Sequence, residues 1–218
     1  MEKETVIQKG IHYWYRLKRE RWLKQLREKN YNHDFSLITN DCVGGVICHD
    51  LGEQFRSPTV NLWIPNAHFL AFAQNLEYYL SCEIKETPDD AKPYPVGTIV
   101  PKDEKHIPIE INFMHYATFE EGYQKWQERS ARVNFDRLYF IWHFFDDDHT
   151  ERVRAFDQWN TRTLVILHEP IHGLKNSETV NCYHENPYNG KILSIVEETG
   201  KRYLDDVDYL GFLQKNKV

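Results

Sequence analysis

The chain has 218 residues, of which 41% are hydrophobic and 14% aromatic, and its formal net charge is −6. This composition supports a sizeable core and excludes an intrinsically disordered protein. No apolar run approaches the roughly 20 residues of a membrane helix, and no apolar segment follows the first charges as it would in a secretory signal. The four cysteines show no CxxC spacing. We therefore expect a cytoplasmic protein with reduced thiols.

Residues 5–29 have the periodicity of an amphipathic helix. Its apolar stripe is formed by Ile11, Tyr15, Trp22 and Leu26, flanked by Trp14 and Leu23. Residues 1–30 contain nine basic and four acidic side chains, so this segment carries +5 and the remainder −11. The basic face is typical of a solvated helix or of one attracted to an anionic membrane, whereas the acidic body disfavours nucleic acid. The apolar stripe is expected to pack on the body of the protein, with a second copy of the chain or a peripheral membrane contact as alternatives.

Apolar and β-branched segments alternate with helical ones along the rest of the chain. The predicted strands are 35–39, 57–64, 107–113, 137–145 and 162–167, with two weaker strands beyond them. The predicted helices follow Gly44-Gly45, begin at the cap Asn66, begin at a capping box over 118–121, follow Asp146 to His149, and cover 201–214. We expect a basic helical segment over 1–32 and a single domain over 33–218. The pattern predicts an α/β, three-layer fold with a mostly parallel sheet and helices on both faces.

Polar and reactive side chains follow four of the predicted strands. They are Asn40, Asp41 and Cys42 after the first strand, His115 and Tyr116 after the third, Asp146 to His149 after the fourth, and His168, Glu169 and His172 after the fifth. Ligands of open α/β sheets bind beyond the carboxyl ends of the strands, so parallel strands would bring these groups to one edge. The alternative is that loops between strands and helices are polar in any case and supply helix caps.

Cys42 is the candidate nucleophile. It precedes a predicted helix, whose positive N-terminal end favours a thiolate. Gly44 and Gly45 would leave room for a substrate, with backbone amides for an oxyanion. His49 is about 10 Å further along the helix and too far away to act as the base, so His115 is the better candidate. The alternative is a small buried cysteine packed beside a glycine turn.

Two other motifs indicate metal chemistry. Asp146 and Asp148 are spaced to hold a divalent cation that bridges the phosphates of a sugar nucleotide, although acidic residues also cap helices. The segment 168–172, HEPIH, matches a zinc-protease motif that requires a helix. Pro170 interrupts any such helix, so we do not expect a zinc site here.

The motifs ITNDCVGG, LGEQFRSPTVNLWI, NLEYYL, YPVG and FMHYATFEEGYQKWQERSARVN, with the strand ending at Asp146-x-Asp148, occur in this order. Over roughly residues 33 to 170 the chain resembles the bacterial family known as domain of unknown function 1919, whose members are often labelled exopolysaccharide biosynthesis proteins. The family commonly has Asn-Asn-Cys where this chain has Asn40-Asp41-Cys42, so the carboxylate of Asp41 replaces the side-chain amide of the family's second asparagine. The resemblance implies an α/β fold and a setting in capsule or exopolysaccharide biosynthesis, and it implies no catalytic residue.

Three functions are consistent with these features. The first is a transferase that acts on a carbohydrate, with Cys42 as nucleophile, His115 as base, and Asn40, Asp41, Gly44, Gly45, Tyr116 and His168 as binding residues. The second is a metal-dependent glycosyltransferase that binds a sugar nucleotide through Asp146 and Asp148. The third is a non-catalytic partner of the polysaccharide assembly machinery, held at the membrane by its basic N-terminal helix.

Overall fold

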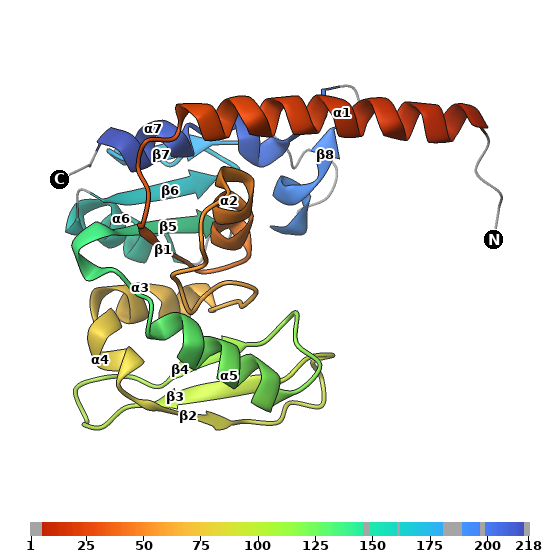
Figure 1. Ribbon diagram of the computed structural model, residues 1–218. Helices are drawn as coiled ribbons and strands as arrows, with labels where there is room; N and C mark the ends of the chain where they lie inside the picture. Colours follow the sequence, from red (N-terminus) through yellow and green to blue (C-terminus); the bar gives the residue numbers. More distant parts are fainter. Residues whose placement is uncertain (1–5, 146–148, 161, 181–188, 197–198, 216–218) are drawn as a thin grey trace.

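The computed structural model describes residues 6–145, 149–160, 162–180, 189–196 and 199–215, without the side chains of residues 6–12, 189 and 190. Its centre is a four-stranded parallel sheet, sheet A, with the strand order β1-β5-β6-β7 (Figure 1). The strands are β1 (Ser36–Thr39), β5 (Leu138–Phe144), β6 (Thr163–Leu167) and β7 (Ser177–Thr179). Because all four run in one direction, their carboxyl ends meet at one edge. This confirms the predicted α/β fold with a mostly parallel sheet.

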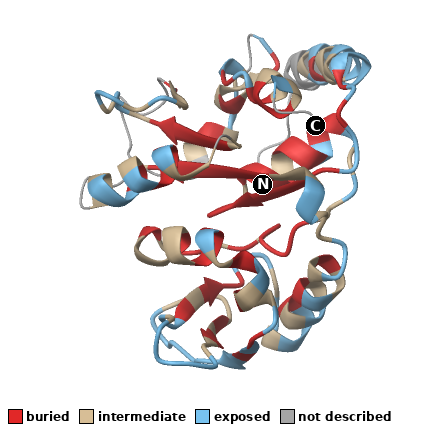
Figure 2. Ribbon diagram, turned by 90° about the vertical axis from the view of Figure 1, so that its left-hand side faces the viewer, coloured by how far each residue is buried: buried red, intermediate tan, exposed pale blue. Residues whose placement is uncertain are grey.

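The two faces of sheet A contribute to two apolar cores. Phe140, Trp142 and Phe144 point into one core, here called the lower core, whereas Tyr139 and Ile141 point into the other, the upper core. Successive side chains of a strand alternate between faces, so a central strand that is covered on both sides must be apolar at nearly every position. Figure 2 shows these strands as buried over most of their length.

Helices cover both faces of sheet A, as predicted. One face packs against α2 (Val43–Leu51), α7 (Tyr209–Lys215) and the 3-10 helices η3 (Asn189–Leu193) and η4 (Tyr203–Asp206). The other packs against α3 (Asn66–Gln74), α4 (Leu76–Leu80) and α6 (Thr150–Trp159). A further 3-10 helix, η1 (Phe135–Arg137), precedes β5, and a small hairpin is formed by β8 (Ile195–Val196) and β9 (Lys201–Arg202).

The predicted strand over 107–113 belongs to a second sheet, sheet B, rather than to the parallel one. Sheet B is antiparallel, with the order β2-β3-β4, and it shares the lower core with α5 (Phe119–Ser130). Its strands are β2 (Glu83–Glu86), β3 (Val96–Val100) and β4 (Ile109–Asn112). Ile109 and Ile111 point into the same core as sheet A's Trp142, so the two sheets are packed through common apolar contacts.

The predicted strand over 57–64 is wrong, since this segment is mostly turns. The Thr59 backbone N–H donates to Ser57 Oγ at 3.3 Å, and Asn61 adopts a left-handed φ of 65°. Such local hydrogen bonds from Ser and Thr compete with strand pairing. Only Trp63 forms an isolated bridge, with Asn112. The segment nonetheless lies against the end of β1, because the Ile64 N–H donates to the Asn40 carbonyl at 2.7 Å.

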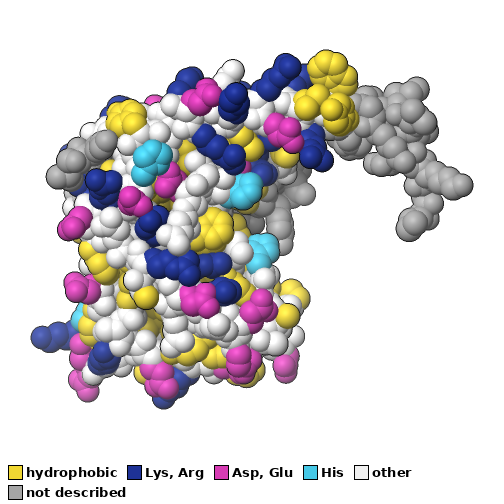
Figure 3. Space-filling view, viewed as in Figure 1, with side chains coloured by type: hydrophobic (Ala, Val, Ile, Leu, Met, Phe, Trp, Pro, Cys, Tyr) yellow, Lys and Arg dark blue, Asp and Glu magenta, His cyan; other side chains and the backbone are white. Residues whose placement is uncertain are grey.

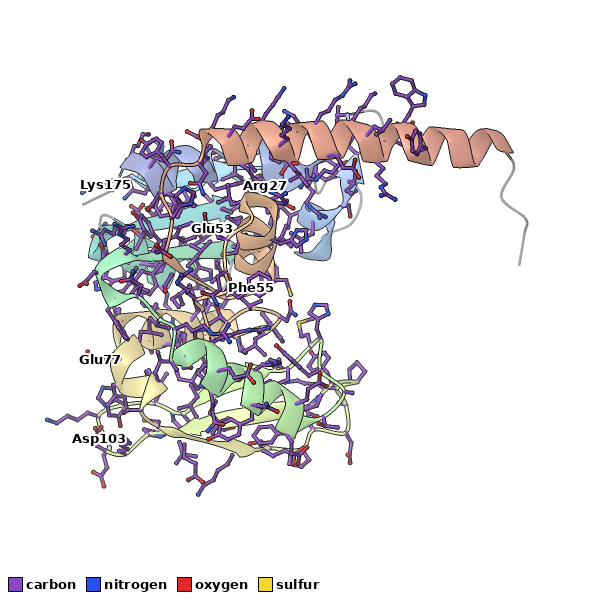
Figure 4. The ribbon with its side chains drawn as sticks, viewed as in Figure 1. Arg27, Glu53, Phe55, Glu77, Asp103 and Lys175 are labelled. Atoms are coloured by element: carbon purple, nitrogen blue, oxygen red, sulfur yellow. The ribbon has the colours of Figure 1, made fainter. Side chains whose placement is uncertain are left out.

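The predicted N-terminal helix is present as α1 (Val6–Lys29). Trp22 and Leu26 pack against the upper core, and the buried Arg19 forms ion pairs with Asp50 of α2 and Asp205 of η4. Arg27 points towards the end of α2, where its guanidinium donates to the His49 and Asp50 carbonyls (Figure 4). The second half of α1 is therefore fixed to the body of the protein.

None of the helices in the described part of the chain has the length and apolar character that a membrane crossing requires.

The helix cap predicted at Asn66 is wrong. Pro65 occupies the cap position of α3, and the Asn66 Oδ1 atom instead accepts a hydrogen bond from Trp142 Nε1 at 2.9 Å. The division into segments 1–32 and 33–218 stays a prediction.

Candidate functional site

Three side-chain contacts shape the turn that carries Cys42. The Thr39 hydroxyl donates to the Asp41 carbonyl at 2.7 Å, and Asp41 Oδ1 accepts from the Val43 N–H at 3.0 Å. The Gly44 N–H donates to Thr39 Oγ1 at 3.3 Å. These contacts end β1 and begin α2, so Cys42 lies at the N-terminal end of that helix, beyond the carboxyl end of its strand.

Cys42 and His115 are brought together from different sheets. Cys42 follows β1 of sheet A, while His115 follows β4 of sheet B, and the Cys42 Sγ atom lies 3.2 Å from His115 Nε2. The thiol is partly buried and the imidazole is exposed. A thiol and an imidazole at this distance can exchange a proton, which is the basic requirement for a cysteine nucleophile and its base. The catalytic roles of both residues remain a prediction.

The acidity of Cys42 differs from the expectation. Burial, and then the neighbouring Asp41 carboxylate, raise the pKa of the Cys42 thiol to about 12. The position at the helix N-terminus does not overcome these two effects, so the thiol is neutral at physiological pH. A nucleophilic role would therefore need a base that removes the proton as the sulfur attacks, and His115 Nε2 is in place to do this.

Sequence reasoning missed His143, which lies at the centre of the site. His143 Nδ1 is 2.6 Å from Asp41 Oδ2, and His143 Nε2 is 2.8 Å from His168 Nε2. The carboxylate accepts a hydrogen bond from Nδ1–H of His143, and one proton lies between the two Nε2 atoms. His143 is fully buried. The pKa of His168 is lowered to about 3, first by the burial of His168 itself and then by the nearby His143. Asp41, His143 and His168 thus form an array, here called the histidine array, that spans the ends of β1, β5 and β6.

Asn40 fixes His143 in this array. Its Nδ2 atom donates to the His143 carbonyl and its Oδ1 atom accepts from the His143 N–H, both at 2.9 Å. The side-chain amide thereby continues the hydrogen bonds between β1 and β5 beyond the last paired residue. Asn40 is completely buried. Asn40 therefore positions His143, and its binding role stays a prediction. Asp41 connects these hydrogen bonds to the turn that holds Cys42.

The two glycines after Cys42 do not leave an open space. A Cβ atom on Gly44 would lie 2.6 Å from both Cγ2 and Oγ1 of Thr39, and one on Gly45 would lie 3.1 Å from Cγ1 of Val60. Neighbouring side chains fill the room expected for a substrate, and the Gly44 amide already has Thr39 as its acceptor. These glycines allow α2 to pack closely on β1 and on the loop before α3.

The other predicted site residues have different positions. The Tyr116 hydroxyl accepts from Arg129 Nη1 of α5 at 2.7 Å and is half-buried against the lower core. Asp146 and Asp148 lie outside the described residues, so the metal site stays a prediction. Segment 168–172 is irregular and includes no helix, whereas the zinc-protease motif requires one. Within the ranges that the structure describes, no group of three or more His, Cys, Asp or Glu residues is arranged to hold a metal ion.

The sequence contains only a weak signal for the role of His143. It is a lone polar residue in the apolar strand LYFIWHF, and it occupies the alternation position of Tyr139 and Ile141, which face α2. Its place one residue before the strand's end puts it within reach of the turn after β1. No sequence spacing, however, reveals that β1 and β5 are neighbours.

Comparison with known proteins agrees with the resemblance noted in the sequence. The model of the family described as "Domain of unknown function (DUF1919)" matches residues 14–214. An uncharacterized protein of Haemophilus influenzae is 32% identical over 196 residues, which cover 88% of this chain and 91% of that protein. The range of the family model runs from within α1 to within α7, so it includes the turn of Cys42 and the histidine array. The chain belongs to the family known as domain of unknown function 1919.

Proposed function

We propose that the protein is a thiol-dependent acyl-transfer enzyme in which Cys42 is the nucleophile and His115 the general base. The observation that carries this proposal is the 3.2 Å separation between Cys42 Sγ and His115 Nε2. The pair lies beyond the carboxyl end of β1 in a parallel sheet, where open α/β folds bind their ligands.

The reaction begins with a neutral thiol. As Cys42 Sγ attacks an acyl carbonyl, its proton passes to His115 Nε2, and the tetrahedral intermediate then releases the leaving group, which takes that proton. A thioester on Cys42 results. An acceptor hydroxyl or water next loses its proton to His115 and attacks the thioester, and the thiol regains a proton as it leaves. The histidine array holds Asp41, and with it the turn of Cys42, in place during both steps.

The biological setting remains part of the proposal. The resemblance suggested surface-polysaccharide biosynthesis, in which the acceptor would be a carbohydrate hydroxyl. Cytoplasmic location is consistent with Cys42, Cys48 and Cys82, which are all free thiols. Two alternatives remain. A metal-dependent glycosyltransferase would use Asp146 and Asp148, and a non-catalytic partner of the assembly machinery would show no thiol chemistry.

The test is acylation of Cys42. The full chain would be incubated with a p-nitrophenyl ester and, separately, with an acyl-coenzyme A, and the acylated peptide would be identified by mass spectrometry. We expect an adduct on Cys42, accompanied by a burst of p-nitrophenol. His115→Gln should slow its formation by about 10²- to 10⁴-fold, which is the usual contribution of a general base.

Cys48→Ala is the matched control, because Cys48 is a buried thiol whose pKa is likewise raised to about 12. This variant should acylate at the normal rate, whereas Cys42→Ala should not acylate at all. Equal rates for His115→Gln and the unaltered protein would overturn the role of His115. Unaltered ester turnover in Cys42→Ala would overturn the proposed function as a whole.

A further inference from the structure

The first half of α1 extends beyond the body of the protein. Gly200, just before β9, packs against α1, since a Cβ atom on this residue would lie 3.1 Å from both the Tyr15 carbonyl oxygen and the Arg19 nitrogen. On the N-terminal side of this contact, the helix continues past the sheets and the other helices (Figure 1). Large aromatic side chains lie on α1 near its contact with Gly200, within the range from Tyr13 onward in which side chains are described.

Two aromatic side chains are exposed on this part of the helix. Tyr13 and Trp14 are each 62% exposed, which is more than any other large hydrophobic residue among those described. Arg16 and Lys18 lie within one turn of them, and Arg21 within two turns. Figure 3 shows hydrophobic and basic side chains gathered along this extended part of α1. We call Tyr13, Trp14, Arg16, Lys18 and Arg21 the aromatic-basic surface.

The charge of α1 is opposite to that of the body. Residues 13–29 contain seven basic and two acidic side chains, a net +5, which leaves −11 for the remainder of a chain of net charge −6. Arg19 is used internally, in its ion pairs with Asp50 and Asp205. The other cations of this stretch are largely exposed. Arg16 and Lys24, for example, form surface ion pairs with Glu20 and Glu28, and their side chains remain 77% and 78% exposed.

From these observations we propose that the aromatic-basic surface binds the surface of an anionic lipid bilayer. Indole and phenol rings are apolar with one polar group, so they are stable at the boundary between headgroups and acyl chains. Nearby cations add attraction to anionic lipids. The negative body would be repelled by the same bilayer, so only α1 approaches it and the protein adopts one orientation. This proposal does not depend on the chemistry of Cys42.

Vesicle sedimentation tests the proposal. The full chain would be mixed with vesicles of phosphatidylcholine alone or of phosphatidylcholine with phosphatidylserine, at low and at high salt. We expect sedimentation with the phosphatidylserine vesicles at low salt and its loss at high salt, because screening weakens attraction between exposed charges. Trp14→Ser should weaken binding at least about fivefold, in line with the loss of an interfacial aromatic ring.

Phe135→Ser and Lys105→Gln are the matched controls. Phe135 is 47% exposed but lies in η1, and Lys105 is an exposed cation remote from α1 in sequence. Both variants should bind vesicles normally, whereas Arg21→Gln should bind more weakly. The proposal is overturned if the unaltered chain does not sediment, or if Trp14→Ser and Phe135→Ser behave alike. It is also overturned if Trp14→Ser abolishes a dimer seen by light scattering without changing vesicle binding, since a second copy would then be the partner.

Discussion

The protonation state of His168 depends strongly on the fold. Its pKa is lowered from 6.5 to about 3 by burial and then by the nearby His143, and this outweighs the opposite effect of Asp41. Between these two values the unfolded chain binds a proton that the folded protein does not. The stability contribution is therefore complete above pH 6.5 and is lost progressively as the pH falls towards 3.

Replacing His168 should reveal this linkage. The urea midpoint of the unaltered protein is expected to fall below pH 6.5, and that of His168→Gln should fall less, because glutamine binds no proton. His172→Gln is the control, since His172 is exposed and its backbone carbonyl accepts a hydrogen bond from Arg154. Identical acid sensitivity in His168→Gln and the unaltered protein would contradict the assignment.

The pairing of Cys42 with His115 could be predicted from the sequence, because His49 was too far along its helix to act as the base. The sequence did not allow His143 to be found, because a single histidine in an apolar strand has no characteristic spacing. The acidity of Cys42 was also predicted in the wrong direction. The helix terminus is visible in the sequence, but the burial and the position of the Asp41 carboxylate that outweigh it depend on the folded chain.

Among the secondary-structure elements, the strands that are apolar on both faces were the easiest to predict. β5 and β6 lie within the predicted ranges, because only a central, doubly covered strand produces such runs. Segment 57–64 is equally β-branched, yet Ser57 and Thr59 bind one another and turn the chain. The separation of β4 into sheet B could not be predicted either, since alternation along a strand does not identify its neighbours.

The contact between α2 and β1 depends on Gly44. We expect Gly44→Ala to lower the free energy of unfolding by about 1–3 kcal/mol, the usual cost of overpacking, because the new methyl group would overlap the Thr39 side chain. Gly45→Ala should cost less, since its nearest neighbour is 3.1 Å rather than 2.6 Å away. Chemical denaturation measures both.

Thr39→Ala provides the double-mutant test of this contact. This substitution removes Oγ1 and Cγ2 of Thr39, the two atoms that the new methyl group would overlap. Gly44→Ala should therefore cost less in that background than in the unaltered protein, with a coupling energy of about 0.5–3 kcal/mol. Strictly additive effects would show that Gly44 is needed for a reason other than its contact with Thr39.

At the scale of the whole molecule, the second half of α1 stabilises the fold. Removing residues 1–29 would expose the upper core where Trp22 and Leu26 pack, and it would leave Asp50 and Asp205 buried without Arg19. Breaking a buried ion pair by removing one partner costs about 3–5 kcal/mol. We expect a large fall in melting temperature, measured by differential scanning calorimetry.

Removal of residues 1–12 alone is the matched control for this truncation. Among the described side chains, the part of α1 that lies against Gly200 consists of Tyr15, Lys18 and Arg19, so we expect this shorter truncation to leave the melting temperature nearly unchanged. If both truncations lowered it equally, the stabilising contacts would have to involve the first turns of the helix. If neither did, the ion pairs of Arg19 would contribute nothing to stability.

The pairing of β1 with β5 has a consequence for the order in which the chain folds during synthesis. Ser36 pairs with Leu138, about a hundred residues later, whereas sheet B is built from neighbouring segments. Closing so long a loop is slow compared with forming local hairpins. On the ribosome, sheet B can therefore form while β1 still waits for its partner. During that interval the apolar β1 has no strand partner, so we expect the nascent protein to be prone to aggregation until β5 has been synthesised.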